Sequence, residues 1–201
     1  MIQSLRSVKP LRMDEPAFPL SVEQYHEMIR AGIITDDDPV ELLEGGLVFR
    51  MGKNPPHSVA TQKLFAKILT VLPGGWACRV QEPVTLEDGE PEPDAAIVRG
   101  RNEDYFEHHP GPSEAAVVIE VSDSTLSRDR GIKLRSYARA GVQAYWIVNL
   151  IDRQVEVYTR PVSTEEVPTY AEQQVFTPGQ TVPVVLDGQT VVELAVSDIL
   201  P

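Results

Sequence analysis

Two acidic residues lie in or beside short apolar runs, where a carboxylate needs a specific partner. Glu120 follows the apolar run 115–119 and precedes Val121. Such a run is typical of a central strand buried on both faces. An ionised carboxylate there costs several kcal/mol, roughly, unless it meets a metal ion or a cation. Asp94 opens the preceding apolar run, 95–98. If the two strands are neighbours, both carboxylates converge near one end of the sheet and suit Mg²⁺, which prefers oxygen ligands.

A lysine and several arginines follow Glu120 in the next predicted helix, over 127–140. Lys133 lies in the first turns of this helix, and its amine can reach back to the strand end. The stretch 128–139 carries five basic residues against one acid, a local charge of +4. A metal ion beside a lysine and a basic helix suits phosphodiester hydrolysis, because that reaction needs an activated nucleophile and stabilisation of developing charge. The predicted nucleic-acid contacts are Arg128, Arg130 and Arg135.

The rest of the chain supplies the elements that must position these residues. Apolar periodicity, proline and glycine mark the limits of each element. In chain order we predict an extended arm over 1–20, a capped helix from Ser21 to Arg30, a hairpin of 40–43 and 47–51, a helix between Pro55-Pro56 and Pro73, apolar runs at 76–86, 95–98 and 115–121, a helix over 127–140, strands over 144–150 and 154–159, and edge strands after 161. Together they predict a mixed sheet with helices on its faces.

The order of the reactive residues resembles a known nuclease pattern. Pro93-Asp94, then Glu120-Val121-Ser122, then Lys133 resembles the PD-(D/E)xK nuclease superfamily, except that Ser122 stands where the superfamily has its lysine. The chain more closely resembles the bacterial Uma family of restriction-endonuclease-like proteins. The matching pieces are VELLEGGLV at 40–48, His57 before the first long helix, PEPDAAIV at 91–98, VVIEVSDST at 117–125 and DRGIKLRSYARAGVQAYWIVN at 129–149.

This resemblance implies a fold, a site and an activity. The implied fold is a restriction-endonuclease-like α/β core, a mixed β-sheet flanked by helices, with Asp94, Glu120 and Lys133 in its active site. In such a site Asp94, Glu120 and the Val121 carbonyl would hold Mg²⁺ or Mn²⁺. Lys133 would orient the attacking water or help to deprotonate it, and Glu41 would anchor a second metal ion or orient that water. The implied activity is metal-dependent endonucleolytic cleavage, with DNA as the expected substrate.

Length and composition suit one domain. The chain has 201 residues and a net charge of −12. We expect an N-terminal arm and short helix at 1–39, a nuclease-like core at 40–160, and an acidic β extension at 161–201. A lone cysteine, Cys78, excludes both a disulfide scaffold and a zinc ribbon. Apolar runs are too short for a signal peptide or a membrane span, so a cytoplasmic location is the default expectation.

Each site residue has a simpler interpretation. Glu120 could form a structural ion pair with Lys133 or an arginine. Asp94, after Pro93, could cap a turn. Lys133 could pair with Asp129, four residues earlier on the helix. Glu41, at the start of a hairpin strand, could be solvated. Two further residues have interpretations without chemistry: His57 starts a helix and Tyr137 packs in the core.

Two other functions compete with nuclease activity. A non-catalytic binding or scaffold protein is suggested by the charge of −12, which weakens the approach to DNA unless the basic helix focuses positive charge. The deciding feature is whether 128–139 shares one face with Arg6, Lys9 and Arg12. The second is a hydrolase of a small phosphate compound, which a closed pocket would favour. Apolar strand edges in the tail would permit a homodimer, as expected for an enzyme that cuts two strands.

Overall fold

The structure is a computed structural model that describes residues 17–163 and 166–201. The first sixteen residues of the expected arm, with Arg6, Lys9 and Arg12, lie outside the described residues. Within the described part, no helix has the length and apolar character needed to cross a bilayer. The proposed division of the chain at 39/40 and 160/161, and the cytoplasmic location, stay predictions.

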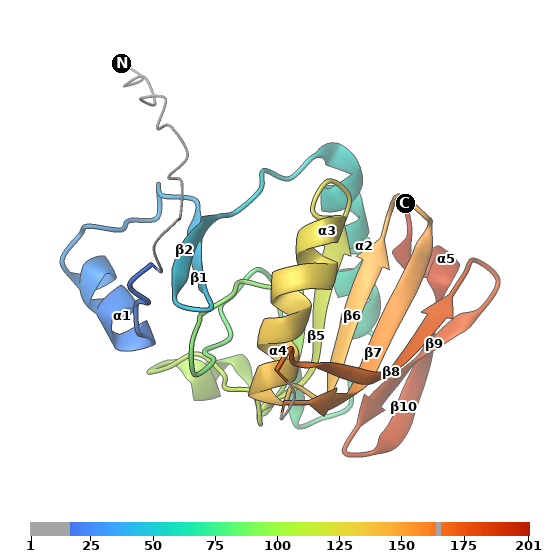
Figure 1. Cartoon of the computed structure of the whole chain (residues 1–201). Coiled ribbons are helices and arrows are strands. Elements are labelled where there is room, and N and C mark those ends of the chain that lie inside the picture. Colours follow the sequence, from blue (N-terminus) through green and yellow to red (C-terminus); the bar gives the residue numbers. More distant parts are fainter. Residues whose placement is uncertain (1–16, 164–165) are drawn as a thin grey trace.

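A six-stranded mixed sheet forms the centre of the molecule (Figure 1), with the order β3-β4-β5-β6-β7-β8. Only β5 and β6 run parallel, and the helices between them make the crossover that parallel neighbours require. The α/β fold class expected from the sequence is therefore confirmed. The strand bounds are β3 (Trp76–Arg79), β4 (Ala95–Arg99), β5 (Ala115–Ser122), β6 (Ala144–Asn149), β7 (Gln154–Val162) and β8 (Thr169–Phe176).

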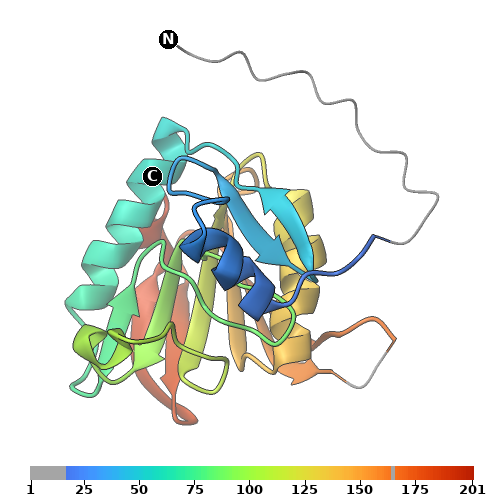
Figure 2. The same ribbon diagram turned by 90° about the vertical axis from the view of Figure 1, so that its left-hand side faces the viewer.

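Different elements cover the two faces of this sheet (Figure 2). One face packs against α2 (Pro55–Leu69), the hairpin of β9 (Thr181–Leu186) and β10 (Gln189–Ala195), and α5 (Val196–Ile199). The other packs against α4 (Leu134–Ala140). Alternation along β5 divides its side chains between them. Val117, Ile119 and Val121 join the α2 core, while Val118 joins the α4 core. By the same alternation Glu120 points toward the α4 side.

A small N-terminal unit lies beside the sheet. It contains α1 (Val22–Arg30) and the hairpin of β1 (Val40–Leu43) and β2 (Gly46–Phe49). The predicted capping box is present, because Ser21 Oγ accepts from Gln24 N and the Gln24 side chain accepts from Ser21 N. Leu42 packs with Tyr25 to form the centre of the unit. A bridge from Leu42 to Glu90 ties the hairpin to the chain segment that precedes β4.

Two predicted elements differ most from their expected limits. The apolar run 76–86 is a strand only as far as Arg79, because Gln81 takes a positive φ of 56° and turns the chain out of the sheet. The predicted helix over 127–140 consists of α3 (Leu126–Arg128), a π-helical turn (Asp129–Lys133) and α4. Gly131 departs from helical geometry inside that turn. A short 3₁₀ helix, Asn102–Tyr105, lies between β4 and β5.

Candidate active site

Antiparallel pairing of β4 with β5 brings the two predicted acids to one end of the sheet. Ala95 pairs with Ile119, so Asp94, just before β4, lies beside the end of β5. Asp94 Oδ2 accepts a hydrogen bond of 2.8 Å from the main-chain N–H of Val121. A pocket of about 70 Å³ opens there, and it is lined by Asp94, Glu120, Lys133 and Glu41 together with Arg50, Met51, Lys53, His57, Gln81, Glu92, Val121, Thr125, Arg128 and Asp129.

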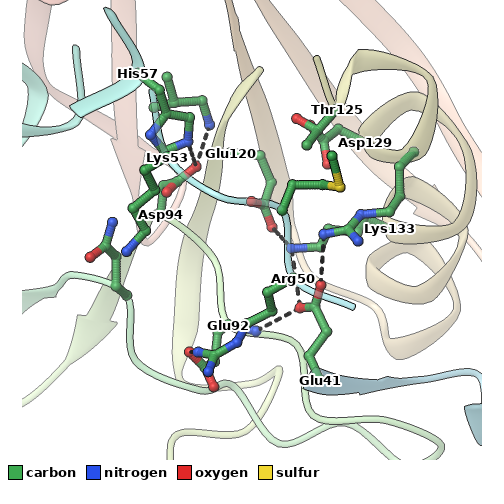
Figure 3. A pocket seen from close by; sticks show the side chains of 14 residues that line it. Glu41, Arg50, Lys53, His57, Glu92, Asp94, Glu120, Thr125, Asp129 and Lys133 are labelled. Carbon is green, nitrogen blue, oxygen red and sulfur yellow. Dashed lines mark hydrogen bonds and ion pairs between the residues drawn. The ribbon is translucent and has the colours of Figure 1, made fainter. Parts of the chain in front are cut away.

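Lys133 lies between two buried carboxylates in this pocket (Figure 3). Its Nζ lies 2.8 Å from Glu120 Oε1 and 3.3 Å from Glu41 Oε2, and its side chain is 4% exposed. Burial alone would lower the pKa of Lys133, but the surrounding carboxylates, Glu120 foremost, outweigh burial and raise it above the ordinary value. The ion pair foreseen as a simpler interpretation of Glu120 is therefore present, and it lies inside the pocket.

Glu120 is the carboxylate most affected by burial. Desolvation raises the pKa of Glu120, and the nearby Lys133 ammonium opposes that rise. The phenol of Tyr137 donates a second hydrogen bond to Oε1, at 3.0 Å. Tyr137 therefore does more than pack in the core. Its position four residues after Lys133, on the same face of the helix, is the signal in the sequence that could have identified it.

Glu41 is buried rather than solvated. Its side chain is 1% exposed, and both of its oxygens have partners. Oε1 accepts from Arg128 Nη2 at 3.0 Å. Oε2 accepts from the main-chain N–H of Glu92 at 3.1 Å and faces Lys133. Glu92 in turn pairs with Arg50. Neither Glu92 nor Arg50 was singled out in the sequence, although Glu92 belongs to the PEPD piece.

Asp129 does not pair with Lys133, as the helical spacing suggested it could. Its Oδ2 accepts hydrogen bonds of 2.6 Å from the hydroxyls of Ser122 and Thr125. The π-helical turn between Asp129 and Lys133 removes the spacing on which the alternative was based. Asp129 thus fastens the turn that leads from β5 into α3.

The oxygens that remain available fit a hard divalent cation. Among the described residues, hydrogen bonds reach Asp94 only at Oδ2 and Glu120 only at Oε1. Asp94 Oδ1 and Glu120 Oε2 are thus left for another ligand. Within the described ranges, no group of three or more His, Cys, Asp or Glu side chains could hold a metal ion. Two carboxylates suit Mg²⁺, because this ion keeps several waters and uses few protein ligands.

Every cation in the basic stretch has an acidic partner. The pairs are Arg128 with Glu41, Arg130 with Glu156 and Asp152, Lys133 with Glu120 and Glu41, Arg135 with Glu44, and Arg139 with Glu44 and Asp88. The local charge of +4 is therefore compensated by acids from distant parts of the chain. Contact of Arg128, Arg130 and Arg135 with a nucleic acid stays a prediction.

Comparison with known proteins identifies the family. A family model described as "Uma2: Putative restriction endonuclease" matches residues 22–197. The chain belongs to this family. The resemblance noted in the sequence is thereby confirmed, and membership of Uma2 supports a nuclease function. No curated protein matches the chain.

A solved structure shares the fold of this Uma2 protein. It is described as a "putative nuclease belonging to DUF820 from Anabaena variabilis ATCC 29413". The match has a TM-score of 0.64 at 16% sequence identity, and covers 90% of this chain and 97% of that chain. At this identity the likeness concerns the fold alone, which is the mixed sheet flanked by helices expected from the sequence.

Proposed function

We propose that this Uma2 protein hydrolyses phosphodiester bonds of a nucleic acid, with DNA as the expected substrate and Mg²⁺ or Mn²⁺ as the cofactor. The observation that carries the proposal is the Lys133 ammonium held against Glu120 in the pocket that Asp94 also lines. Restriction-endonuclease-like families generally use divalent metal ions, which agrees with the two available carboxylate oxygens.

The residues proposed to hold the ion are Asp94 and Glu120, with the carbonyl of Val121 as a third ligand. When bound, the ion would lower the pKa of a water molecule and polarise the scissile phosphate. The protein contributes a fixed direction for each carboxylate. Val121 N–H holds one oxygen of Asp94, and Lys133 and Tyr137 hold one oxygen of Glu120.

Lys133 is proposed to stabilise negative charge. The sequence left open whether it orients the attacking water or helps to deprotonate it. Because nearby carboxylates raise its pKa, the amine stays protonated at neutral pH and cannot accept a proton. A buried ammonium is well suited to offset charge that develops on the phosphate oxygens.

Glu41 is proposed to position Lys133. Two roles were predicted for it, anchoring a second ion or orienting the water, and both require a free oxygen. Its two oxygens already accept from Arg128, Glu92 N–H and Lys133. Glu41 therefore acts through Lys133, by keeping the ammonium directed into the pocket.

The nucleic acid is proposed to approach along the α3–α4 side, where Arg128, Arg130 and Arg135 are partly exposed. Phosphates would compete there with the acids that now pair with these arginines. A pocket of about 70 Å³ is far below the roughly 300–1,000 Å³ of a small-molecule site, which disfavours the small-phosphate alternative. A homodimer remains part of the proposal, because two such sites would allow both strands of a duplex to be cut in one binding event.

A nuclease assay on plasmid and single-stranded DNA tests the proposal. The wild type should cut with Mg²⁺ or Mn²⁺ and not with EDTA. Asp94→Ala, Glu120→Ala and Lys133→Ala should each remove cutting. Lys67→Ala, which breaks the exposed pair between Lys67 on α2 and Asp198 on α5, is the matched control and should cut normally.

Cutting that survives EDTA, or that is undiminished in all three site variants, would refute the catalytic proposal. A wild type that binds DNA without cutting it would favour the non-catalytic binding protein instead.

A further inference from the structure

His57 is held in a fixed place at the start of α2. Asn54 caps this helix, and its Oδ1 accepts a hydrogen bond of 3.0 Å from His57 N. The Asn54 side chain also donates to Asp123, in the turn after β5. Two prolines, Pro55 and Pro56, begin the helix and restrict its backbone. The start of α2 is thereby joined to the strand end that carries Glu120.

The imidazole of His57 contacts one oxygen of Asp94. Its Nε2 lies 3.0 Å from Asp94 Oδ2, the same oxygen that accepts from Val121 N–H. Because a carboxylate only accepts hydrogen bonds, Nε2 carries the hydrogen in this contact. Two donors from two different elements therefore hold Oδ2, and Oδ1 remains free for a ligand. Figure 3 shows His57 and Asp94 together on the side of the pocket opposite Lys133.

The other ring nitrogen has no hydrogen-bond partner in the described part of the chain. His57 Nδ1 is buried and makes no hydrogen bond to any described residue. If His57 served only to stabilise the start of the helix, we would expect its buried Nδ1 to hydrogen-bond a group there. Among the described residues, the one hydrogen bond of the ring is to Asp94, so this hydrogen bond is what the ring contributes to the pocket.

We propose that His57 is a positioning residue that fixes the carboxylate of Asp94 for divalent-ion binding. The inference rests on the proposed function, in which Asp94 is a metal ligand. A carboxylate that is already fixed loses less rotational freedom when it binds an ion, so affinity rises. Removing a hydrogen-bond partner of a metal ligand typically costs about 10–100-fold in affinity.

Calorimetric titration of the full chain with Mn²⁺ tests this role without requiring catalysis. His57→Ala should weaken Mn²⁺ binding about 10–100-fold. His57→Gln should recover most of the loss, because its amide nitrogen reaches about as far as Nε2. His57→Asn should not recover it, because its shorter side chain places the amide near the Nδ1 position. In the Asp94→Ala background, His57→Ala should have no further effect.

His26→Ala is the matched control. His26 Nε2 contacts the buried carboxylate of Glu90 at 2.9 Å, outside the pocket, so its loss should leave Mn²⁺ affinity unchanged. Thermal unfolding of each variant in EDTA separates a role in metal binding from a role in folding.

The results that would overturn the metal site differ from those that would overturn the role of His57 alone. A wild type that binds neither Mn²⁺ nor Mg²⁺ would overturn the metal site and this role with it. A wild type that binds Mn²⁺ while His57→Ala binds it equally well would overturn the role of His57 alone. So would equal affinities in His57→Gln and His57→Asn, or a loss of affinity that follows only the loss of thermal stability.

Discussion

Replacing Lys133 with methionine removes the ammonium from between two buried carboxylates and keeps most of the side-chain volume. At most 5% of each side chain is exposed for Lys133, Glu120 and Glu41. Glu41 keeps two other donors when Lys133 is lost. Among the described residues, Glu120 keeps only the hydroxyl of Tyr137. Glu120 is therefore the group whose charge is left without compensation.

The expected loss of unfolding free energy depends on whether Glu120 stays ionised or binds a proton. Removing one member of a buried ion pair typically costs about 3–5 kcal/mol. Glu120 can avoid part of this cost by binding a proton. Burial raises the pKa of Glu120 to about 8 even with Lys133 in place, so at pH 7 the wild type and the variant both hold this proton. The two proteins differ where the wild type releases the proton, above about pH 8. We expect Lys133→Met to lose about 3 kcal/mol of unfolding free energy near pH 9.

The pH dependence of the stability of Lys133→Met provides a second, independent test. Without the ammonium, the pKa of Glu120 in the folded variant rises above its wild-type value of about 8. The stability of the variant relative to the wild type should therefore fall as the pH rises above about 8, and the deficit should be smaller at pH 7.

Urea unfolding at pH 7 and pH 9 measures both effects. Adding Glu120→Gln to Lys133→Met should restore stability, because a neutral amide needs no counter-ion. Lys67→Met, which breaks an exposed pair with Asp198, is the control and should change stability by at most about 1 kcal/mol. A loss below about 1 kcal/mol in Lys133→Met near pH 9, a deficit independent of pH, or a double variant no more stable than the single one would contradict the role given to the ion pair.

Three further substitutions test other parts of the structure. Burial alone would raise the pKa of Glu156, but hydrogen bonds, that of Arg130 foremost, lower it to about 2. The resulting stability, roughly 3 kcal/mol, is present above about pH 4.5 and lost as the pH falls toward 2, so Glu156→Gln should flatten the acid-unfolding curve there. Tyr137→Phe removes a donor to buried Glu120 and should cost about 1–3 kcal/mol in urea unfolding. Gly141→Ala places a side chain at φ 79° in open space, so backbone strain alone should cost about 1–2 kcal/mol in thermal unfolding. Unchanged stability in any of them would contradict the corresponding contact or strain.

The central strands and their acids could be predicted because the signal is local. The run before Glu120 is apolar without alternation, which is typical of a strand buried on both faces. Asp94 precedes a similar run, and consecutive strands usually pair. Those two observations were enough to bring the acids to the same end of the sheet. The capping box at Ser21 is local in the same way.

The contacts around the site could not be predicted, because they join residues far apart in the chain. Lys133 meets Glu41 across 92 positions, and Arg135 meets Glu44 across 91. No periodicity relates such pairs, so the basic stretch looked unpaired in the sequence. The contact of His57 with Asp94 was missed for the same reason, since it depends on how α2 packs on the sheet.

The π-helical turn was missed for a different reason. The spacing of apolar residues over 127–140 fits one regular helix, and a single extra residue in one turn hardly changes that pattern. Its effect on the site is nevertheless large. It allows Asp129 and Lys133 to contact different partners, Ser122 and Glu120, instead of each other.

The proposed function requires that Asp94 and Glu120 bind one divalent ion. Crystals soaked in Mn²⁺ can locate this ion without assuming any activity, because manganese scatters anomalously. We expect an anomalous peak within bonding distance of Asp94 Oδ1 and Glu120 Oε2. A peak at another place, or none in crystals where both carboxylates are ordered, would contradict it.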